Sequence, residues 1–102
     1  MKVINLVMTK KSSISLEFDN ILPELLFDKS LRQINETIIY RGNKEEPLSH
    51  YFDVSIEGEC DDAKECAIVI DGDLSRVKRI GFAMTCGKII ANSDVDFHVG
   101  AC

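Results

Sequence analysis

The chain has 102 residues, a common size for one domain, and its 45% hydrophobic and 28% charged residues exclude an intrinsically disordered protein. Twelve basic against 17 acidic side chains give a net charge of −5, which argues against binding to nucleic acid or an anionic membrane. No apolar run reaches the roughly 18 residues of a membrane span, and residues 1–8 are typical of a strand, so we expect neither a transmembrane helix nor a signal peptide.

The first part of the chain predicts short strands followed by short helices. Residues 2–8 alternate loosely between apolar and polar side chains, and residues 14–18 alternate strictly, which is typical of strands. Residues 21–27 predict a short helix, and Ser30 is a suitable N-cap for a second helix over 31–34.

Two further strands precede an acidic stretch. Residues 37–40 are β-branched and aromatic, and a turn at Gly42 separates them from a strand over 51–56. Residues 57–65 are acidic and polar, and we place the boundary between two regions there. An apolar strand over 66–70 then leads into the second region.

The second region, residues 60–102, is punctuated by glycines, whereas residues 1–59 form a small N-terminal α+β region. Gly81 and Gly100 lie 19 residues apart at equivalent points of a repeat, and short β-prone pieces run between the turns. Glycine makes tight turns without a steric penalty, and branched side chains stack on a neighbouring coil. The predicted corners of the coil are Gly72, Gly81, Met84, Gly87 and Gly100. We therefore expect a mostly β protein in which the α+β region caps the start of a right-handed parallel β-helix.

The residues of this repeat resemble a known family. The segments that carry the resemblance are 72–81, Met84, 87–90 and 98–101. They are similar to the formylmethanofuran dehydrogenase C-subunit family, and the likeness extends over nearly the whole chain. A similar glycine repeat occurs in the C-terminal part of the large subunit of glutamate synthase, but residues 73–81 favour the dehydrogenase family. At the second corner, residues 93–96 stand where the family has two glycines.

The resemblance implies a structural role. The family's enzyme is an archaeal complex that reduces carbon dioxide to formylmethanofuran in the first step of methanogenesis. It carries a tungsten or molybdenum pterin cofactor and iron–sulfur clusters on other subunits, against which the C-subunit packs as a β-helix. The resemblance therefore implies no catalytic, cofactor-binding or metal-binding residue in this chain, and the other subunits of the complex as its partners.

The sequence stops in the middle of a repeat, at Cys102. A single coil cannot bury its own stacking edge, so we expect association through the 81–102 end. The alternative is a free-standing β-helix scaffold or binding module, such as a homodimer that closes its own edge.

The cysteines are candidates for other chemistry. Without an export signal, Cys60, Cys66, Cys86 and Cys102 are expected to be free thiols in the cytoplasm. Cys60 and Cys66 are separated by five residues, which does not fit the usual zinc or iron–sulfur spacing. A second alternative is a small enzyme in which Cys86 is a nucleophile beside a histidine, His98 or His50. A small residue filling a tight turn is the simpler interpretation of Cys86.

Charged side chains near the corners have a similarly simple interpretation. The carboxylates are Asp71, Asp73, Asp94 and Asp96. They do not follow the spacing of a calcium loop, and aspartate commonly accepts hydrogen bonds from turn backbone. The basic run over 76–79 could hold an acidic partner or an anionic cofactor, but a solvated strand face is the expected interpretation.

Overall fold

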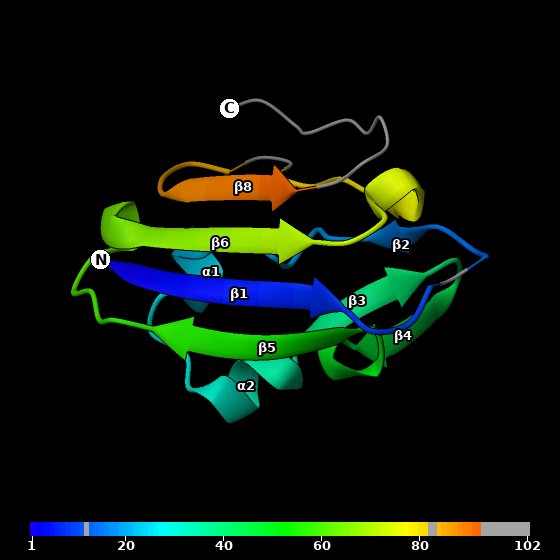
Figure 1. The fold of residues 1–102 in the computed structure, drawn as a ribbon, viewed down its shortest axis with the longest axis horizontal. Coiled ribbons are helices and arrows are strands. Elements are labelled where there is room, and N and C mark those ends of the chain that lie inside the picture. The colour runs from blue at the N-terminus through cyan, green and yellow to red at the C-terminus, as the bar shows by residue number, and fades with distance from the viewer. Residues whose placement is uncertain (12, 82–83, 93–102) are drawn as a thin grey trace.

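Two four-stranded sheets make up most of this mixed α+β protein (Figure 1). The computed structural model describes residues 1–11, 13–81 and 84–92. The elements in chain order are β1 (Lys2–Met8), β2 (Leu16–Glu17), α1 (Pro23–Leu26), α2 (Leu31–Asn35), β3 (Ile38–Arg41), β4 (Lys44–Pro47), η1 (Leu48–His50), β5 (Phe52–Glu57), η2 (Ala63–Glu65), β6 (Cys66–Asp71), η3 (Leu74–Arg76), β7 (Val77–Lys78) and β8 (Lys88–Asn92). The prediction of a mostly β chain with short helices in its first part is confirmed.

The first sheet, with strand order β5-β1-β6-β8, brings distant parts of the chain side by side. β1 pairs antiparallel with β5 and parallel with β6, and β6 pairs parallel with β8. Ile4 lies opposite Ile56 and Ile68, and Ile68 lies opposite Ile89. Because side chains alternate between the faces of a strand, this register directs one row of isoleucines to the same face.

The second sheet, with strand order β4-β3-β2-β7, joins the first part of the chain to the second in the same way. β3 and β4 form a hairpin whose turn contains Gly42 at φ +61°. β2 pairs parallel with β7, and the Phe18 N–H donates to the Lys78 carbonyl at 3.0 Å, one residue beyond β2. In each sheet, a strand from residues 1–59 therefore pairs with one from residues 60–92.

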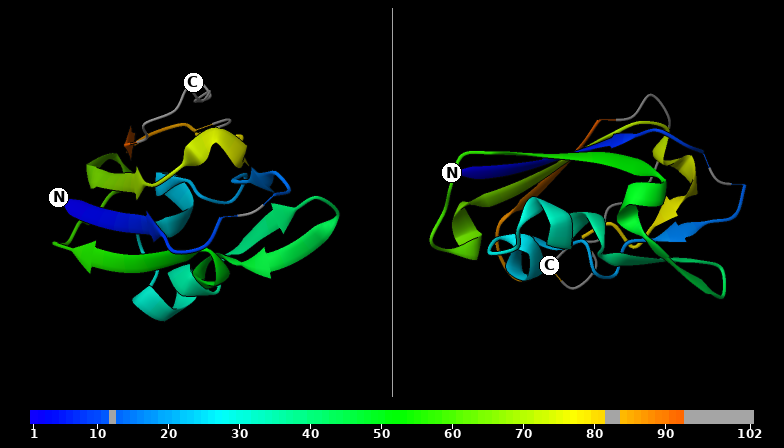
Figure 2. Two further views of the ribbon diagram at one scale, coloured as in Figure 1. Left: turned by 45° about the vertical axis from the view of Figure 1, so that its right-hand side comes forward. Right: turned by 90° about the horizontal axis from the view of Figure 1, so that it is seen from below.

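The hydrophobic core lies between the sheets and the helices. Helix α1 contacts β6 and helix α2 contacts β5, so both cover the inner face of the first sheet (Figure 2). The rings of Phe18 and Phe52 meet edge to face, with centroids 5.4 Å apart. Fully buried side chains include Ile4, Leu6, Leu16, Phe18, Ile21, Ile34, Ile39, Leu48, Phe52, Ile68, Ile70 and Leu74.

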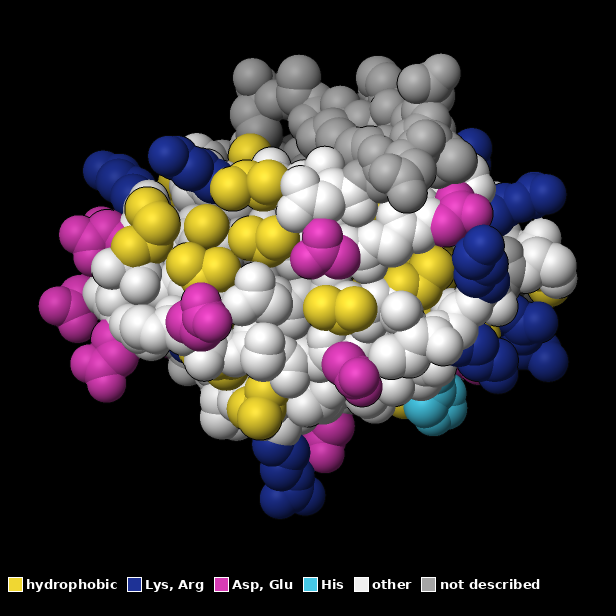
Figure 3. Space-filling view, viewed as in Figure 1, with side chains coloured by type: hydrophobic (Ala, Val, Ile, Leu, Met, Phe, Trp, Pro, Cys, Tyr) yellow, Lys and Arg dark blue, Asp and Glu magenta, His cyan; other side chains and the backbone are white. Residues whose placement is uncertain are grey.

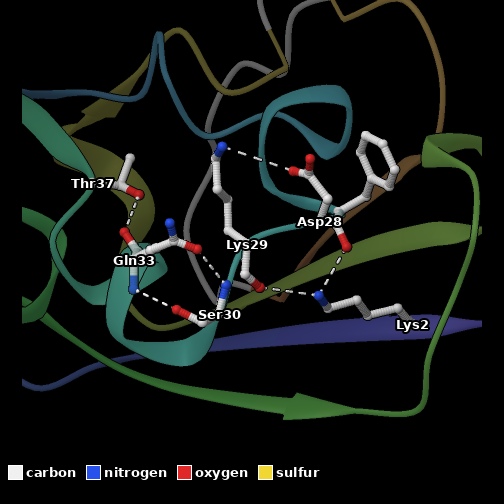
Figure 4. Close-up of polar contacts among 7 residues, drawn as sticks. Lys2, Asp28, Lys29, Ser30, Gln33 and Thr37 are labelled. Carbon is white, nitrogen blue, oxygen red and sulfur yellow. Dashed lines mark hydrogen bonds and ion pairs between the residues drawn. The ribbon is translucent and has the colours of Figure 1, made fainter.

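A capping box fixes the start of α2 (Figure 4). The Gln33 N–H donates to Ser30 Oγ at 3.2 Å, and the Ser30 N–H donates to Gln33 Oε1 at 2.9 Å. The predicted N-cap at Ser30 is thus confirmed. Lys2 Nζ donates to the carbonyl oxygens of Phe27 and Lys29, at 2.8 and 3.2 Å, and so ties the segment between the helices to β1.

Several elements differ in length from the sequence expectation. The expected strand over 14–18 is paired only at Leu16–Glu17, with β3 on one side and β7 on the other. Strand β4 was not predicted, because its residues, Lys44–Pro47, include three charged side chains and a proline. It forms through pairing with β3 at the sheet edge, where a proline is tolerated.

Candidate functional site

Each sheet ends in a strand from the second part of the chain, β8 in the first sheet and β7 in the second. Within the described residues, no strand pairs with the outer side of either one. The outward N–H and C=O groups of an edge strand can pair with another strand. These two edge strands, called here the open end, are therefore the candidate interaction site.

The predicted corner residues lie in the loops around the open end. Gly72 follows β6 with φ +142°, and its N–H donates to the Asn92 carbonyl at 3.2 Å. Gly81 follows β7 with φ +69°, and its carbonyl accepts from the Met84 N–H at 3.1 Å. Gly87 directly precedes β8. The last predicted corner, residue 100, lies outside the described residues.

Gly87 stands where the chain passes very close to its neighbours. Its φ is +81°, and a Cβ at this position would lie 2.4 Å from Pro23 Cβ and 2.8 Å from the Cys66 carbonyl oxygen. Such distances leave no room for a side chain. Glycine here therefore allows β8 to begin directly against β6 and α1.

A carboxylate that the sequence analysis did not single out holds the loop before β8. Glu24 Oε2 accepts hydrogen bonds from the Thr85 N–H at 2.8 Å and from Thr85 Oγ1 at 2.7 Å. Partial burial opposes ionisation of Glu24, but the hydrogen bonds from Thr85 outweigh it and lower the pKa of the carboxyl group. Glu24, on helix α1, therefore holds the loop that leads into β8. No local sequence signal pairs two residues so far apart.

Cys86 comes close to two cysteines that are neighbours in the sequence, Cys60 and Cys66, near the start of β6. Cys66 is buried in the core, and Cys60 packs against that core. Burial raises the pKa of the Cys66 thiol to about 11, and the neighbouring thiols of Cys60 and Cys86 add to the rise. All three are free thiols, as predicted, and Cys102 lies outside the described residues. Burial therefore favours the protonated form of Cys66, which is the less reactive one.

The described residues include some, but not all, of the residues on which the alternatives to a structural role depend. His50 Nδ1 lies 3.8 Å from Glu46 Oε1, and the other candidate partner of Cys86, His98, lies outside the described residues. No three or more His, Cys, Asp or Glu side chains in the described part of the chain are arranged to hold a metal ion. No helix there has the length and apolar character needed to cross a membrane.

Asp73 has the predicted turn chemistry. Its Oδ1 accepts from the Ser75 N–H at 3.1 Å and from Ser75 Oγ at 2.7 Å, which caps the short helix η3. These hydrogen bonds and the nearby Lys11 lower the pKa of the Asp73 carboxyl group. In the basic run over 76–79, Arg79 Nε donates to Asp19 Oδ1 at 2.6 Å and Val77 is buried. Asp94 and Asp96 lie outside the described residues.

Comparison with known proteins gives no match to any family model. Curated proteins do match, over nearly the whole chain. The C-subunit of tungsten-containing formylmethanofuran dehydrogenase 2 from Methanothermobacter wolfeii is 40% identical over 102 residues, which cover 99% of this chain and 37% of that protein. The C-subunit of molybdenum-containing formylmethanofuran dehydrogenase 1 from Methanosarcina barkeri is 38% identical over 99 residues, 97% of this chain and 33% of that protein.

A third relative has a lower coverage. The C-subunit of molybdenum-containing formylmethanofuran dehydrogenase 1 from Methanothermobacter thermautotrophicus is 41% identical over 96 residues, 92% of this chain and 23% of that protein. The chain thus spans between 23% and 37% of the length of these curated relatives.

Proposed function

We propose that this chain, a homologue of the C-subunit of formylmethanofuran dehydrogenase, is a non-catalytic structural subunit, or a shortened relative of one, in a complex of that kind. The observation that carries the proposal is the identity of 38–41% across nearly all of its residues. The complex would reduce carbon dioxide to formylmethanofuran in methanogenesis, and its other subunits would be the partners of this chain.

We further propose that residues 60–102 are the first coils of a right-handed parallel β-helix, capped by residues 1–59. The parallel pairing of β1 with β6 and of β6 with β8, together with that of β2 with β7, supports this proposal. Consecutive coils of a β-helix stack their strands in parallel in this way. The open end would then be the surface on which further strands or another subunit stack.

In this proposal the tungsten or molybdenum pterin and the iron–sulfur clusters of the complex are held by other subunits. A cysteine must lose its proton to bind a metal, and burial of Cys66 opposes that loss. The free thiols of the described residues suit a reducing compartment, so we place the protein in the cytoplasm.

Purification of the tagged full-length chain from a methanogen under anoxic conditions tests the proposal. We expect large tungsten- or molybdenum-containing chains to co-purify with it, identified by mass spectrometry and metal analysis. A chain that elutes alone would contradict the subunit role. Sedimentation velocity at low micromolar concentration then distinguishes the alternative, a homodimer closed through the open end.

Two matched variants test whether the open end binds the other subunits. Proline cannot donate a backbone hydrogen bond, so Ala91→Pro in β8 should abolish co-purification. Glu45→Pro places the same residue in β4, the edge strand on the other side of the second sheet. This variant should co-purify with the complex as well as the unaltered chain does. Equal co-purification of both variants, each shown to be folded by circular dichroism, would exclude the open end as the contact.

A further inference from the structure

Strand β6 has the composition of a strand that is buried on both faces. Its first five residues, Cys66–Ile70, are all apolar, whereas a strand with one face in water alternates between apolar and polar side chains. Ile68 and Ile70 are fully buried in the core. Because side chains alternate, Ala67 and Val69 face the other way, to the outer side of the first sheet.

The neighbouring strands extend this apolar surface. Val3 lies opposite Ala67, and Val69 lies opposite Ile90. These four residues therefore form a contiguous group on the outer face, called here the outer patch. Ile90 is 47% exposed, Val3 and Val69 are half-buried, and the small side chain of Ala67 is buried between them. Figure 3 shows apolar side chains gathered on the face formed by β1, β6 and β8. An apolar group on an outer sheet face that includes an exposed isoleucine suits a protein–protein contact.

Carboxylates border the outer patch. The outward position opposite Val3 on β5 is Glu57, and the outward positions opposite Val7 are Asp53 on β5 and Asp71 on β6. Acidic side chains lie among and below the apolar ones in Figure 3. Among the described residues paired on this face of the sheet, Lys88 is the one basic side chain in register with them. The surface therefore has an apolar centre and a mostly acidic border.

This charge pattern decides between two kinds of partner. A second copy of the chain would bring its own acidic border against the first, and each copy carries a net charge of −5. A different protein with lysine or arginine around an apolar centre would be attracted instead. The occupant that fits is therefore another protein with a basic border.

We propose that the outer patch is the docking surface for another subunit of the dehydrogenase complex, one that presents an apolar surface bordered by lysine or arginine. This inference rests on the proposed function. It adds which surface of the chain contacts the complex, and the chemistry of the partner surface at that contact. The outer patch differs from the open end, because it would bind through side chains on the face of the sheet, whereas the open end would bind through the backbone of the edge strands.

The test measures binding of the full-length chain to dehydrogenase purified from a host that lacks this chain. Ile90→Asp should weaken binding at least tenfold, because it replaces the most exposed apolar side chain of the outer patch with a charge. The matched control is Leu31→Asp, since Leu31 is 45% exposed on α2, which lies on the inner side of the first sheet (Figure 2). That control should change binding less than twofold. Glu57→Lys at the border should also weaken binding and reduce its sensitivity to salt.

The outcomes separate the two proposals. Equal binding by the Ile90 and Leu31 variants overturns the docking surface and leaves the subunit role in place. No binding by the unaltered chain contradicts the subunit role, and the docking surface falls with it. A homodimer that Ile90→Asp converts to monomers assigns the outer patch to a second copy and also overturns the inference. If Ile90→Asp does not fold, the exposed variant Glu57→Lys decides. The inference is overturned if binding of the unaltered chain depends on salt and Glu57→Lys changes neither the affinity nor that dependence.

Discussion

The Glu24 carboxylate and Thr85 join two segments that are 61 residues apart in the sequence. Glu24 Oε2 accepts from both the N–H and the hydroxyl group of Thr85, at 2.8 and 2.7 Å. Thr85 lies three residues before β8, so the contact fixes the loop that delivers this edge strand to the sheet. The β8 side of the open end is thus held by a polar contact with α1 as well as by the core.

Glu24→Gln should lower the free energy of unfolding at pH 7 by about 1 kcal/mol, because it removes the charge that strengthens two hydrogen bonds. Urea denaturation measures this change. Glu36→Gln is the control, since Glu36 pairs with Arg32 on an exposed helix surface, and it should change stability by less than about 0.5 kcal/mol. Indistinguishable losses in the two variants would argue against a positioning role for Glu24.

The same contact predicts a pH dependence. The hydrogen bonds lower the pKa of Glu24 in the folded protein below its ordinary value of 4.5. The contribution to stability is therefore fully present above about pH 4.5 and is lost as the pH falls through the folded value. Unfolding measured from pH 7 to pH 3 should show a shallower acid loss in Glu24→Gln than in the unaltered chain. Parallel curves for the two proteins would refute the prediction.

Gly87→Ala should destabilise the protein by more than roughly 1 kcal/mol, because it adds a steric clash to an unfavourable φ. The added Cβ would lie 2.4 Å from Pro23 Cβ. Gly42→Ala is a matched control, since Gly42 also has a positive φ, +61°, but its Cβ would meet Ile14 at 3.4 Å. Thermal unfolding should show the larger drop in the midpoint for Gly87→Ala, and a similar drop in both would mean that φ alone matters.

Cys66 should resist alkylation in the folded protein. Burial raises the pKa of its thiol to about 11, and the thiolate is the reactive form. Iodoacetamide at mildly alkaline pH, followed by peptide mass spectrometry, should label Cys60 and Cys86 first. In concentrated urea the three should react at similar rates. Labelling of Cys66 as fast as Cys60 in the native protein would show that its site opens readily.

Phe18→Ala should cost about 3–5 kcal/mol of stability, because it removes a fully buried ring that packs edge to face on Phe52. Leu25→Ala is the control, since Leu25 is 44% exposed on α1, and it should change stability by about 0.5 kcal/mol or less. Chemical denaturation of both variants measures the difference. A small loss for Phe18→Ala would indicate that the core repacks around the missing ring.

Local patterns in the sequence predicted much of the secondary structure. The alternation of residues 2–8, the apolar run over 66–70 and the N-cap at Ser30 each depend on neighbours within a few residues, and each prediction agrees with the structure. Strand β4 was missed because its charged residues have no local preference for a strand.

The sequence by itself determined the likeness to the dehydrogenase C-subunit family, the order of the main elements and the turns that require glycine, because these depend on residue identities and short-range patterns. Only the tertiary structure decided which strands become neighbours. Three contacts join residues that are far apart in the sequence: the pairing of β1 with β6, the approach of Cys86 to Cys66, and the hydrogen bonds from Thr85 to Glu24. Register also decided that Val69 and Ile90 share an outer face, since a shift of one residue would turn them into the core.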